Sequence, residues 1–159
     1  MPSRRSLIEM TADEIRSYLR SNPRLILVSN GANGYPHPMP MNFMLDDEDR
    51  IVVTTFRKSQ KVLNFQRDKR AALLVESGLD YSELKSVLAY ADAEILDDPA
   101  FVLETMLAMA KNGENKSMTQ GLTDAAREQI RASAPKRLIL RFKPHQYVSW
   151  DHTKLKGGY

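Results

Sequence analysis

The chain contains no cysteine, a single tryptophan and only seven glycines among 159 residues. The lack of cysteine excludes disulfide bonds, thiol catalysis and cysteine-ligated metal sites. No apolar run approaches the roughly 20 residues that a membrane-spanning helix needs. Residues 1–10 are charged and lack the apolar core of a secretion signal. We therefore expect a cytoplasmic protein that does not enter a membrane.

Neither sign of charge dominates the chain, whose net charge is +3, but the charges are unevenly distributed. Residues 57–70 hold six cations against Asp68, whereas residues 71–110 hold eight carboxylates against Lys85. Nucleic-acid-binding proteins more often spread their basic residues over one extended face. We therefore expect no nucleic-acid partner, and the local basic segment needs another explanation.

Apolar runs rich in β-branched residues predict a mainly β protein with flanking helices. Antiparallel strands are expected at residues 24–29, 37–45, 50–55, 71–76, 84–96, 137–142 and 147–150. Short connections between the first three predict a meander in which each strand pairs with the next. Six or seven strands with short hairpins indicate a small antiparallel barrel with helices outside it. Since a chain of this length most often has one core, we expect a single domain over residues 1–159.

Helices are predicted by capping signals and by apolar residues at helical spacing. They are expected at residues 12–20, 59–67, 123–132 and from Asp98 onward. Thr11 and Glu14 match a capping box at the first of these helices. The last two predicted helices form a helical insertion at about residues 99–135.

The segment 87–91, VLAYA, is apolar throughout and does not alternate. Such a stretch indicates burial on both faces, or one face packed against a partner. Because a small barrel supplies little cover for a second apolar face, we expect a homodimer.

The stretch TTFRKSQKVLNF, residues 54–65, places three cations and a hydroxyl where a strand is followed by a helix. Amides at a helix start are unpaired and favour an anion. Ser59 and Lys61 would complete a phosphate-binding site there, with Arg57 or Lys58 as a further clamp. The alternative is that Ser59 only caps the helix while the cations remain in water.

Three ordered segments carry a family resemblance. They are G-x-P-x-x-x-P from Gly34, T-x-x-x-S-x-K-x-x-N from Thr55, and S-W-D-H at residues 149–152. In this order they resemble the pyridoxamine 5′-phosphate oxidase-like flavin split-barrel family, over roughly residues 24–98 and 136–155. The resemblance implies a split barrel that dimerises and holds two flavins in clefts between the subunits.

The resemblance also implies which residues contact the cofactor. Those that would hold its phosphate lie at the strand-to-helix junction and are Thr54, Thr55, Arg57, Lys58, Ser59 and Lys61. Those that would contact its ring system are Met41, Asn42 and Phe43. Trp150 would match an aromatic residue that reaches the cofactor from the second subunit. FMN is the favoured cofactor, and an 8-hydroxy-5-deazaflavin is its rival.

Departures from the family narrow the expected activity. Pyridoxamine phosphate oxidases have an Arg-Lys pair where this chain has Gln60 and Lys61, and they end in an Arg- and His-bearing motif that WDHTKLKGGY lacks. Vitamin B6 oxidation is therefore not expected. No nucleophile with a base and an acid is recognisable, which suits a flavin enzyme because the cofactor supplies the chemistry.

The sequence thus predicts an FMN-dependent oxidoreductase that acts on a small organic substrate, with its catalytic residues unassigned. A deazaflavin-dependent reductase is one alternative. A module that binds a flavin or a haem without turnover is the other, since every candidate residue is a cofactor contact.

Overall fold

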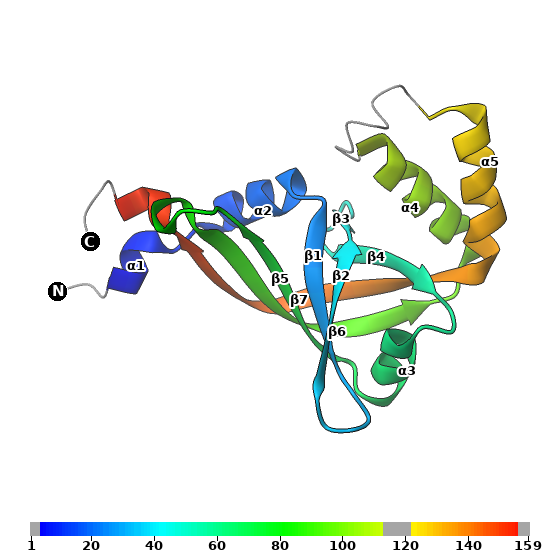
Figure 1. The fold of residues 1–159 in the computed structure, drawn as a ribbon, viewed down its shortest axis with the longest axis horizontal. Helices are drawn as coiled ribbons and strands as arrows, with labels where there is room; N and C mark the ends of the chain where they lie inside the picture. The colour runs from blue at the N-terminus through cyan, green and yellow to red at the C-terminus, as the bar shows by residue number, and fades with distance from the viewer. Residues whose placement is uncertain (1–3, 113–121, 156–159) are drawn as a thin grey trace.

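Seven antiparallel strands form one sheet that curls into a half barrel, with short helices around it (Figure 1). The computed structural model describes residues 4–112 and 122–155. The strands are β1 Arg24–Asn30, β2 Pro36–Asn42, β3 Met44–Leu45, β4 Ile51–Phe56, β5 Arg70–Ser77, β6 Lys85–Leu96 and β7 Arg137–Asp151. Their order across the sheet is β2-β1-β5-β6-β7-β4-β3. This architecture confirms the predicted mainly β, split antiparallel barrel with short helices.

Five α-helices are described, of which α1 was not predicted from the sequence. They are α1 Arg4–Ile8, α2 Ala12–Ser21, α3 Gln60–Arg67, α4 Pro99–Asn112 and α5 Asp124–Ser133. The capping box of α2 is confirmed, since Thr11 Oγ1 accepts from the Glu14 amide and Glu14 Oε2 accepts from the Thr11 amide. Asp98 accepts from the amides of Ala100 and Phe101 at the start of α4. Within residues 4–112 and 122–155, no helix is both long enough and apolar enough to cross a bilayer.

The predicted meander of the first three strands is only partly right, because segment 37–45 is split and reaches β4 only through its last two residues, β3. β1 and β2 do pair, with Leu27 opposite Met39, but β4 pairs with β3 and β7 and not with β2. The predicted strand 37–45 breaks at Phe43, whose N–H donates to the carbonyl of Pro23 (3.1 Å) and not to a neighbouring strand. The chain then continues at the opposite edge of the sheet, where β3 and β4 pair.

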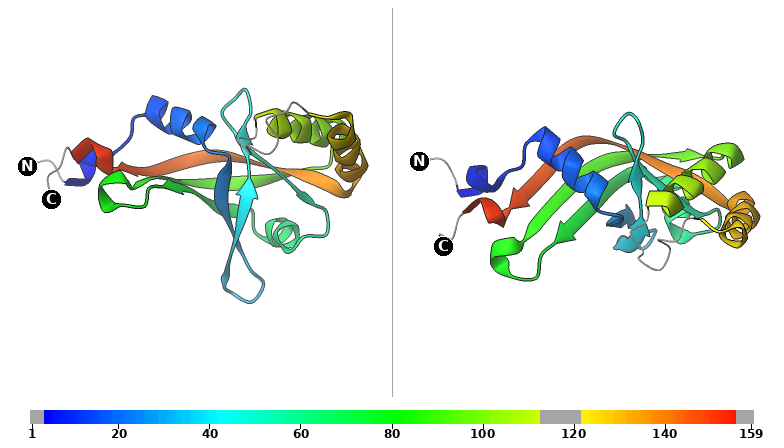
Figure 2. Two further views of the ribbon diagram at one scale, coloured as in Figure 1. Left: turned by 45° about the horizontal axis from the view of Figure 1, so that its top comes forward. Right: turned by 90° about the horizontal axis from the view of Figure 1, so that it is seen from above.

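The two strands predicted at 137–142 and 147–150 are one continuous strand, β7. It pairs with β6 along the whole length of β6, and a register shift after Tyr90 accommodates Pro144. Proline is tolerated in strands at such irregularities. β7 therefore runs from the end of the molecule that carries α4 and α5 to the end that carries α1 (Figure 2).

The inner face of the sheet carries the main core. Leu27, Leu73 and Leu140, from three different strands, are at most 1% exposed. Helix α3 closes this core through Phe65, whose ring meets that of Phe142 edge-on with 5.5 Å between centroids. Burying side chains of this size contributes roughly 1.5–3 kcal/mol each. The packing of Phe65 therefore fixes the position of α3 and of its first turn.

The VLAYA segment is buried on one face only within a single chain. Val87, Ala89 and Ala91 face the core, whereas Leu88 is half-buried and Tyr90 is 39% exposed. Around Leu88 and Tyr90 the opposite face of β6 is therefore apolar and only partly buried within this chain. Burial of the segment on both faces is not what the single chain has, and packing of the second face against a partner stays a prediction.

A second, smaller core lies under α4, on the outer side of β4 and β7. Val102 of α4 is completely buried there and packs with Val52 and Ile139. Helices α4 and α5 occupy the region predicted as a helical insertion. This small core attaches the two helices to the same end of the sheet that carries the strand-to-helix junction.

Candidate functional site

Two hydroxyls and an ammonium group meet where β4 leads into α3. Thr55 Oγ1 lies 3.2 Å from Ser59 Oγ, and Lys61 Nζ donates to Thr55 Oγ1 over 3.2 Å. Ser59 occupies the position before the helix, but its side chain makes no capping hydrogen bond. The structure therefore contradicts the interpretation that Ser59 serves only to cap α3. The amides of Val62 and Leu63 donate to the Ser59 carbonyl, whereas those of Gln60 and Lys61 have no acceptor within the described chain and are available to an anion.

Lys61 is a buried cation without a negatively charged partner. It is 9% exposed, and among the residues that the structure describes it forms no ion pair. Burial, followed by the nearby charge of Arg137, lowers the pKa of the Lys61 ammonium. An uncompensated buried charge is unfavourable. A bound anion would compensate it.

The local sequence explains why Lys61 is drawn inward. Val62 and Phe65 are both core residues of α3, and Asn64 Nδ2 donates to Ser29 Oγ of β1 over 2.9 Å. Residues three and four apart share one side of a helix. Lys61 therefore lies on the side of α3 that Asn64 and Phe65 hold against the sheet.

Other predicted members of the site point elsewhere. Thr54 precedes Thr55 in β4, so its side chain lies on the opposite face of the sheet. Arg57 forms an ion pair with Asp97, and its Nε donates to the carbonyl of Pro135 (3.2 Å). Lys58 is exposed and has no hydrogen bond or ion pair within the described chain. The structure therefore brings together Thr55, Ser59 and Lys61 but not these three.

Arg137 is a candidate that the sequence did not reveal. It is half-buried at the start of β7, where Nε donates to Ser133 Oγ (3.1 Å) and the guanidinium lies 4.1 Å from the ring centroid of Phe56. Burial lowers the pKa of this arginine. No local motif distinguishes it from Arg141 on the same strand. Its pairing with Phe56 places it at this end of the sheet, with its side chain on the face opposite to that of Thr55.

A buried polar row continues from α3 into β1 and β2. Ser29, which accepts from Asn64, is the strand partner of His37. His37 Nδ1 is buried and has no hydrogen-bond partner within the described chain. Unsatisfied buried polar atoms are uncommon in folded proteins. The row therefore offers a ligand at least one further polar contact on the same side of the barrel.

The predicted ring contacts lie at the end of β2. Met41 is half-buried against the main core, Asn42 is exposed and the side chain of Phe43 is 5% exposed. β2 also contacts β4, although the two strands do not pair. These residues therefore lie near the strand that carries Thr55, and their contact with a cofactor ring stays a prediction.

Trp150 lies near the opposite end of β7 from the junction. Thr55 pairs with Leu138, whereas Trp150 pairs with Ser86. The strand from Leu138 to Trp150 spans roughly 40 Å at the usual rise per residue. One chain therefore does not bring Trp150 and Lys61 together, and a cofactor shared by both would need a second copy of the chain.

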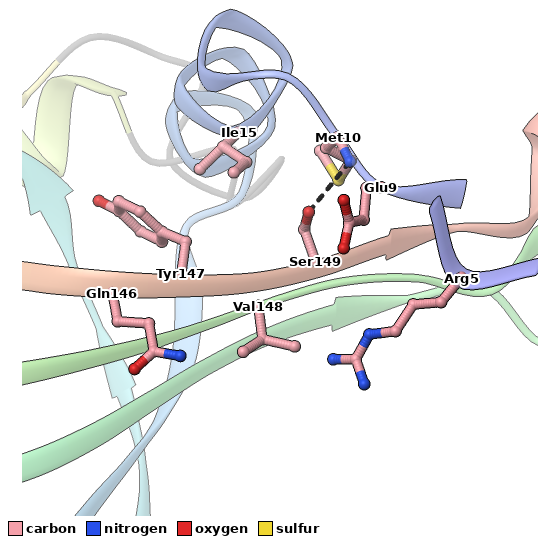
Figure 3. Close-up of a pocket in the computed structure, with 8 residues that line it drawn as sticks. All are labelled: Arg5, Glu9, Met10, Ile15, Gln146, Tyr147, Val148 and Ser149. Carbon is pink, nitrogen blue, oxygen red and sulfur yellow. Dashed lines mark hydrogen bonds between the residues drawn. The ribbon is translucent and has the colours of Figure 1, made fainter. Parts of the chain in front are cut away.

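A pocket of about 340 Å³ lies at the same end as Trp150, between the N-terminal helices and β7 (Figure 3). It is lined by Arg5, Glu9, Met10, Ile15, Gln146, Tyr147, Val148 and Ser149. The amide of Met10 donates to Ser149 Oγ (3.0 Å) and holds the segment before α2 to the strand. None of the predicted site residues lines this pocket.

Comparisons with known proteins bear on the identity of the fold and the family. The family model for pyridoxamine 5′-phosphate oxidase matches residues 11–151. Among curated proteins none matches the chain. A conserved hypothetical protein of Mycobacterium tuberculosis has a similar structure, with TM-score 0.85, 28% identity, and 99% of this chain and 94% of that chain covered.

Two more distant structures share the fold alone. An F420 reductase has TM-score 0.63 and 20% identity, with 83% of this chain and 94% of that chain covered. HutZ, the heme storage protein of Vibrio cholerae, has TM-score 0.64 and 14% identity, with 89% and 96% covered. Since the family model spans most of the sequence and the split barrel agrees with it, the chain belongs to the pyridoxamine 5′-phosphate oxidase family.

Proposed function

We propose that the protein binds FMN with its phosphate at the start of α3 and acts as an oxidoreductase on a small organic substrate. The observation that carries this proposal is Lys61, a buried ammonium whose one hydrogen bond within the described chain goes to the hydroxyl of Thr55. Ser59 and the α3 amides supply further donors beside it. Membership of a family that binds flavins or deazaflavins supports the choice of ligand.

The residues at the junction fit a phosphate monoester. Such a group carries close to two negative charges at neutral pH and offers three acceptor oxygens. The hydroxyls of Thr55 and Ser59, the ammonium of Lys61 and the helix amides are all donors suited to it. Asp97, which lies beside Arg57 of this segment, is already paired with that arginine.

When bound, the flavin would supply the electron and hydride chemistry, and the chain would position it and keep water away. Thr55, Ser59 and Lys61 would hold the phosphate. Met41, at the end of β2, is predicted to contact the ring system. No side chain is assigned as an acid or a base. The substrate is therefore proposed only as a small molecule able to exchange a hydride with a flavin.

We propose further that two copies of the chain form the functional unit. The uncovered face of the long strands, here called the outer face, carries the half-buried residues Ile26, Val28, Leu74, Leu88 and Val148. A contiguous apolar face of this kind favours association. Because Trp150 and Lys61 lie at opposite ends of one chain, a dimer is also the simplest way for both to reach one cofactor.

The proposal has two alternatives, a different cofactor and a function without turnover. A deazaflavin is the second candidate because an F420 reductase shares the fold. If the phosphate of the deazaflavin is linked as a diester, it carries one negative charge, whereas the monoester of FMN carries nearly two. A module that binds a flavin or a haem without turnover is the third, since a heme storage protein also shares the fold. FMN ranks first because its terminal phosphate monoester best matches the donors at the junction, Thr55, Ser59 and the buried Lys61.

The proposal is tested by titrating the purified protein with FMN, riboflavin and F420 and recording absorbance and fluorescence. We expect FMN to form a yellow complex with the protein. The affinity for FMN should exceed the affinity for riboflavin, because riboflavin lacks the phosphate. Preferred binding of F420 would reverse the order of the two cofactors. Binding of neither would remove the enzyme proposal, and tight FMN binding with no reduction of any acceptor would favour the module.

Trp150 gives the dimer proposal an internal reporter, since it is the single tryptophan of the chain. We expect saturating FMN to quench its emission strongly, because a ring placed near Trp150 of the second copy accepts its excitation energy. The control is Trp150→Phe, which should retain a dimer and bind FMN more weakly while losing the signal. Emission that stays unchanged at saturating FMN would contradict the placement of Trp150 at the cofactor.

A further inference from the structure

We propose that His37 and Ser29 together bind one hydroxyl group of the ligand, so that the site selects a phosphate monoester carried on a hydroxylated chain. This inference rests on the proposed function, because it requires a phosphate monoester beside Lys61. It goes further by assigning ligand contacts to two residues outside the strand-to-helix junction and by specifying the chemistry of the ligand next to its phosphate.

His37 and Ser29 lie on the inner face of the sheet, which is also the face that carries Thr55. Ser29 is 1% exposed and lies two positions after the core residue Leu27 of β1. Thr55 lies two positions after the core residue Val53 of β4. His37 is the strand partner of Ser29, and directly opposed residues in antiparallel strands project to the same face, with Cβ atoms about 4.5–5.5 Å apart.

Helix α3 connects these two residues to the phosphate site. Asn64 is completely buried, and its Nδ2 donates to Ser29 Oγ over 2.9 Å. Asn64 lies three positions after Lys61, so the two side chains share one side of the helix. Lys61 in turn donates to Thr55 Oγ1 over 3.2 Å. The polar side chains of Thr55, Lys61, Asn64, Ser29 and His37 therefore follow one another along the inside of the barrel.

The hydrogen bonds of this row leave two positions open. Nδ1 of His37 is buried and has no hydrogen-bond partner in the described parts of the chain. Ser29 Oγ accepts from Asn64, and its own hydrogen finds no acceptor among residues 4–112 and 122–155. Buried polar atoms are nearly always paired, because an unpaired one is costly. A group that pairs with both side chains therefore fits between them.

A hydroxyl group satisfies both open positions, since it accepts one hydrogen bond and donates another. Ser29 offers a donor, and Nδ1 of His37 is an acceptor when the ring carries its hydrogen on Nε2. A carboxylate or a second phosphate offers acceptors alone and would leave Nδ1 unpaired, and an apolar chain would leave both unpaired. In FMN a hydroxylated ribityl chain follows directly on the phosphate, so a hydroxyl is available close to Lys61.

The test compares His37→Leu with His37→Asn, because leucine and asparagine have nearly the same shape and differ in their polar atoms. Asparagine places an amide group about where Nδ1 lies, whereas leucine places a methyl group there. We expect His37→Leu to lose roughly 3- to 10-fold in FMN affinity, the effect of one neutral hydrogen bond. His37→Asn should recover most of that loss. His145→Leu, which replaces an exposed histidine of β7, should leave the affinity unchanged.

The ligand is varied in the same experiment. FMN analogues that each lack one hydroxyl of the ribityl chain are titrated into the wild type and into His37→Leu, with flavin fluorescence as the readout. We expect one analogue to bind the wild type roughly 3- to 10-fold less tightly than FMN. The same analogue should bind His37→Leu as tightly as FMN does, because the partner of that hydroxyl is already gone.

Urea unfolding of the ligand-free protein separates a ligand contact from a structural role. Nδ1 of His37 is a buried atom without a partner when no ligand is bound, so His37→Leu should raise the midpoint of unfolding. A histidine that supports the fold would lower the midpoint when replaced. A lower midpoint together with equal losses for every analogue would make His37 a structural residue and overturn the inference.

The outcomes distinguish this inference from the proposed function. If every analogue loses the same affinity in the wild type and in His37→Leu while FMN still exceeds riboflavin, His37 contacts no hydroxyl and the phosphate site stands. If the wild type binds FMN no more tightly than riboflavin, the phosphate site is wrong and this inference falls with it. The inference is supported when one analogue loses its penalty in His37→Leu and keeps it in His145→Leu.

Discussion

Replacing Lys61 by methionine is expected to weaken FMN binding roughly 10- to 150-fold and to stabilise the ligand-free protein by about 1–2 kcal/mol. The first effect follows from the loss of a charge-assisted contact with the phosphate. The second follows because Lys61 is buried without a counter-charge, and methionine keeps the length of the side chain without the charge. Titration with FMN and urea unfolding of the same preparations measure the two effects.

The sign of the stability effect follows from the direction of the pKa shift. Burial lowers the pKa of Lys61 in the folded state, so the folded protein binds this proton less tightly than the unfolded chain does. The cost of the charge is therefore fully present below the folded pKa and disappears as the pH rises through the unfolded value of about 10.4. The advantage of Lys61→Met should be present at pH 7 and shrink at strongly alkaline pH.

Arg67→Gln is the matched control for Lys61→Met. Arg67 also belongs to α3 and carries the same charge, but it is exposed at the far end of the helix and contacts the carbonyl of Asn30. Its loss should change FMN affinity little. Equal losses from both variants would indicate a diffuse positive field, and no loss from Lys61→Met would mean that the junction holds no phosphate.

The second large effect is expected from Leu88→Asp on the outer face. Wild-type protein should sediment at about twice the mass of 18.1 kDa, and the variant should sediment as a monomer that no longer binds FMN. Leu88 is half-buried at the centre of the long strands. A carboxylate there would have to be desolvated in a dimer but could remain in water in a monomer. Sedimentation and FMN titration at the same protein concentration measure both results.

Leu79→Asp controls for the added charge. Leu79 is 99% exposed in the loop between β5 and β6, away from the outer face, so its replacement should leave the dimer and FMN binding intact. A circular dichroism spectrum like that of the wild type would establish that Leu88→Asp is folded. A wild-type protein that is monomeric and still binds FMN would overturn the dimer, and so would a Leu88→Asp variant that remains dimeric.

Local features of the structure were readable from the sequence. The capping box of Thr11 and Glu14, the cap at Asp98 and the positions of most strands depend on neighbours within a few residues, and each appears as predicted. The proximity of Ser59 and Lys61 has the same origin, since both lie within one helical turn. The mainly β class follows from the number and spacing of apolar runs, which do not depend on how the strands pair.

The tertiary structure decided which distant residues meet. β4 pairs with β7 and not with β2. Strand β2 ends before Phe43, whose amide donates to the carbonyl of Pro23. Such long-range backbone pairing leaves no trace in local periodicity. The same applies to ion pairs. Nothing within the basic segment indicates that Arg57 pairs with Asp97, forty positions further along the chain.

The sequence by itself therefore determined most of the strands, four of the helices and the caps at Thr11 and Asp98, because short-range sterics and hydrogen bonds decide these. Only the tertiary structure decided that Lys61 is buried without a carboxylate, that Asp97 neutralises Arg57 and that Arg137 lies beside Phe56. It also decided that Trp150 lies at the far end of β7. Burial and charge compensation are properties of the assembled surface around a residue, and that surface comes from segments far apart in the chain.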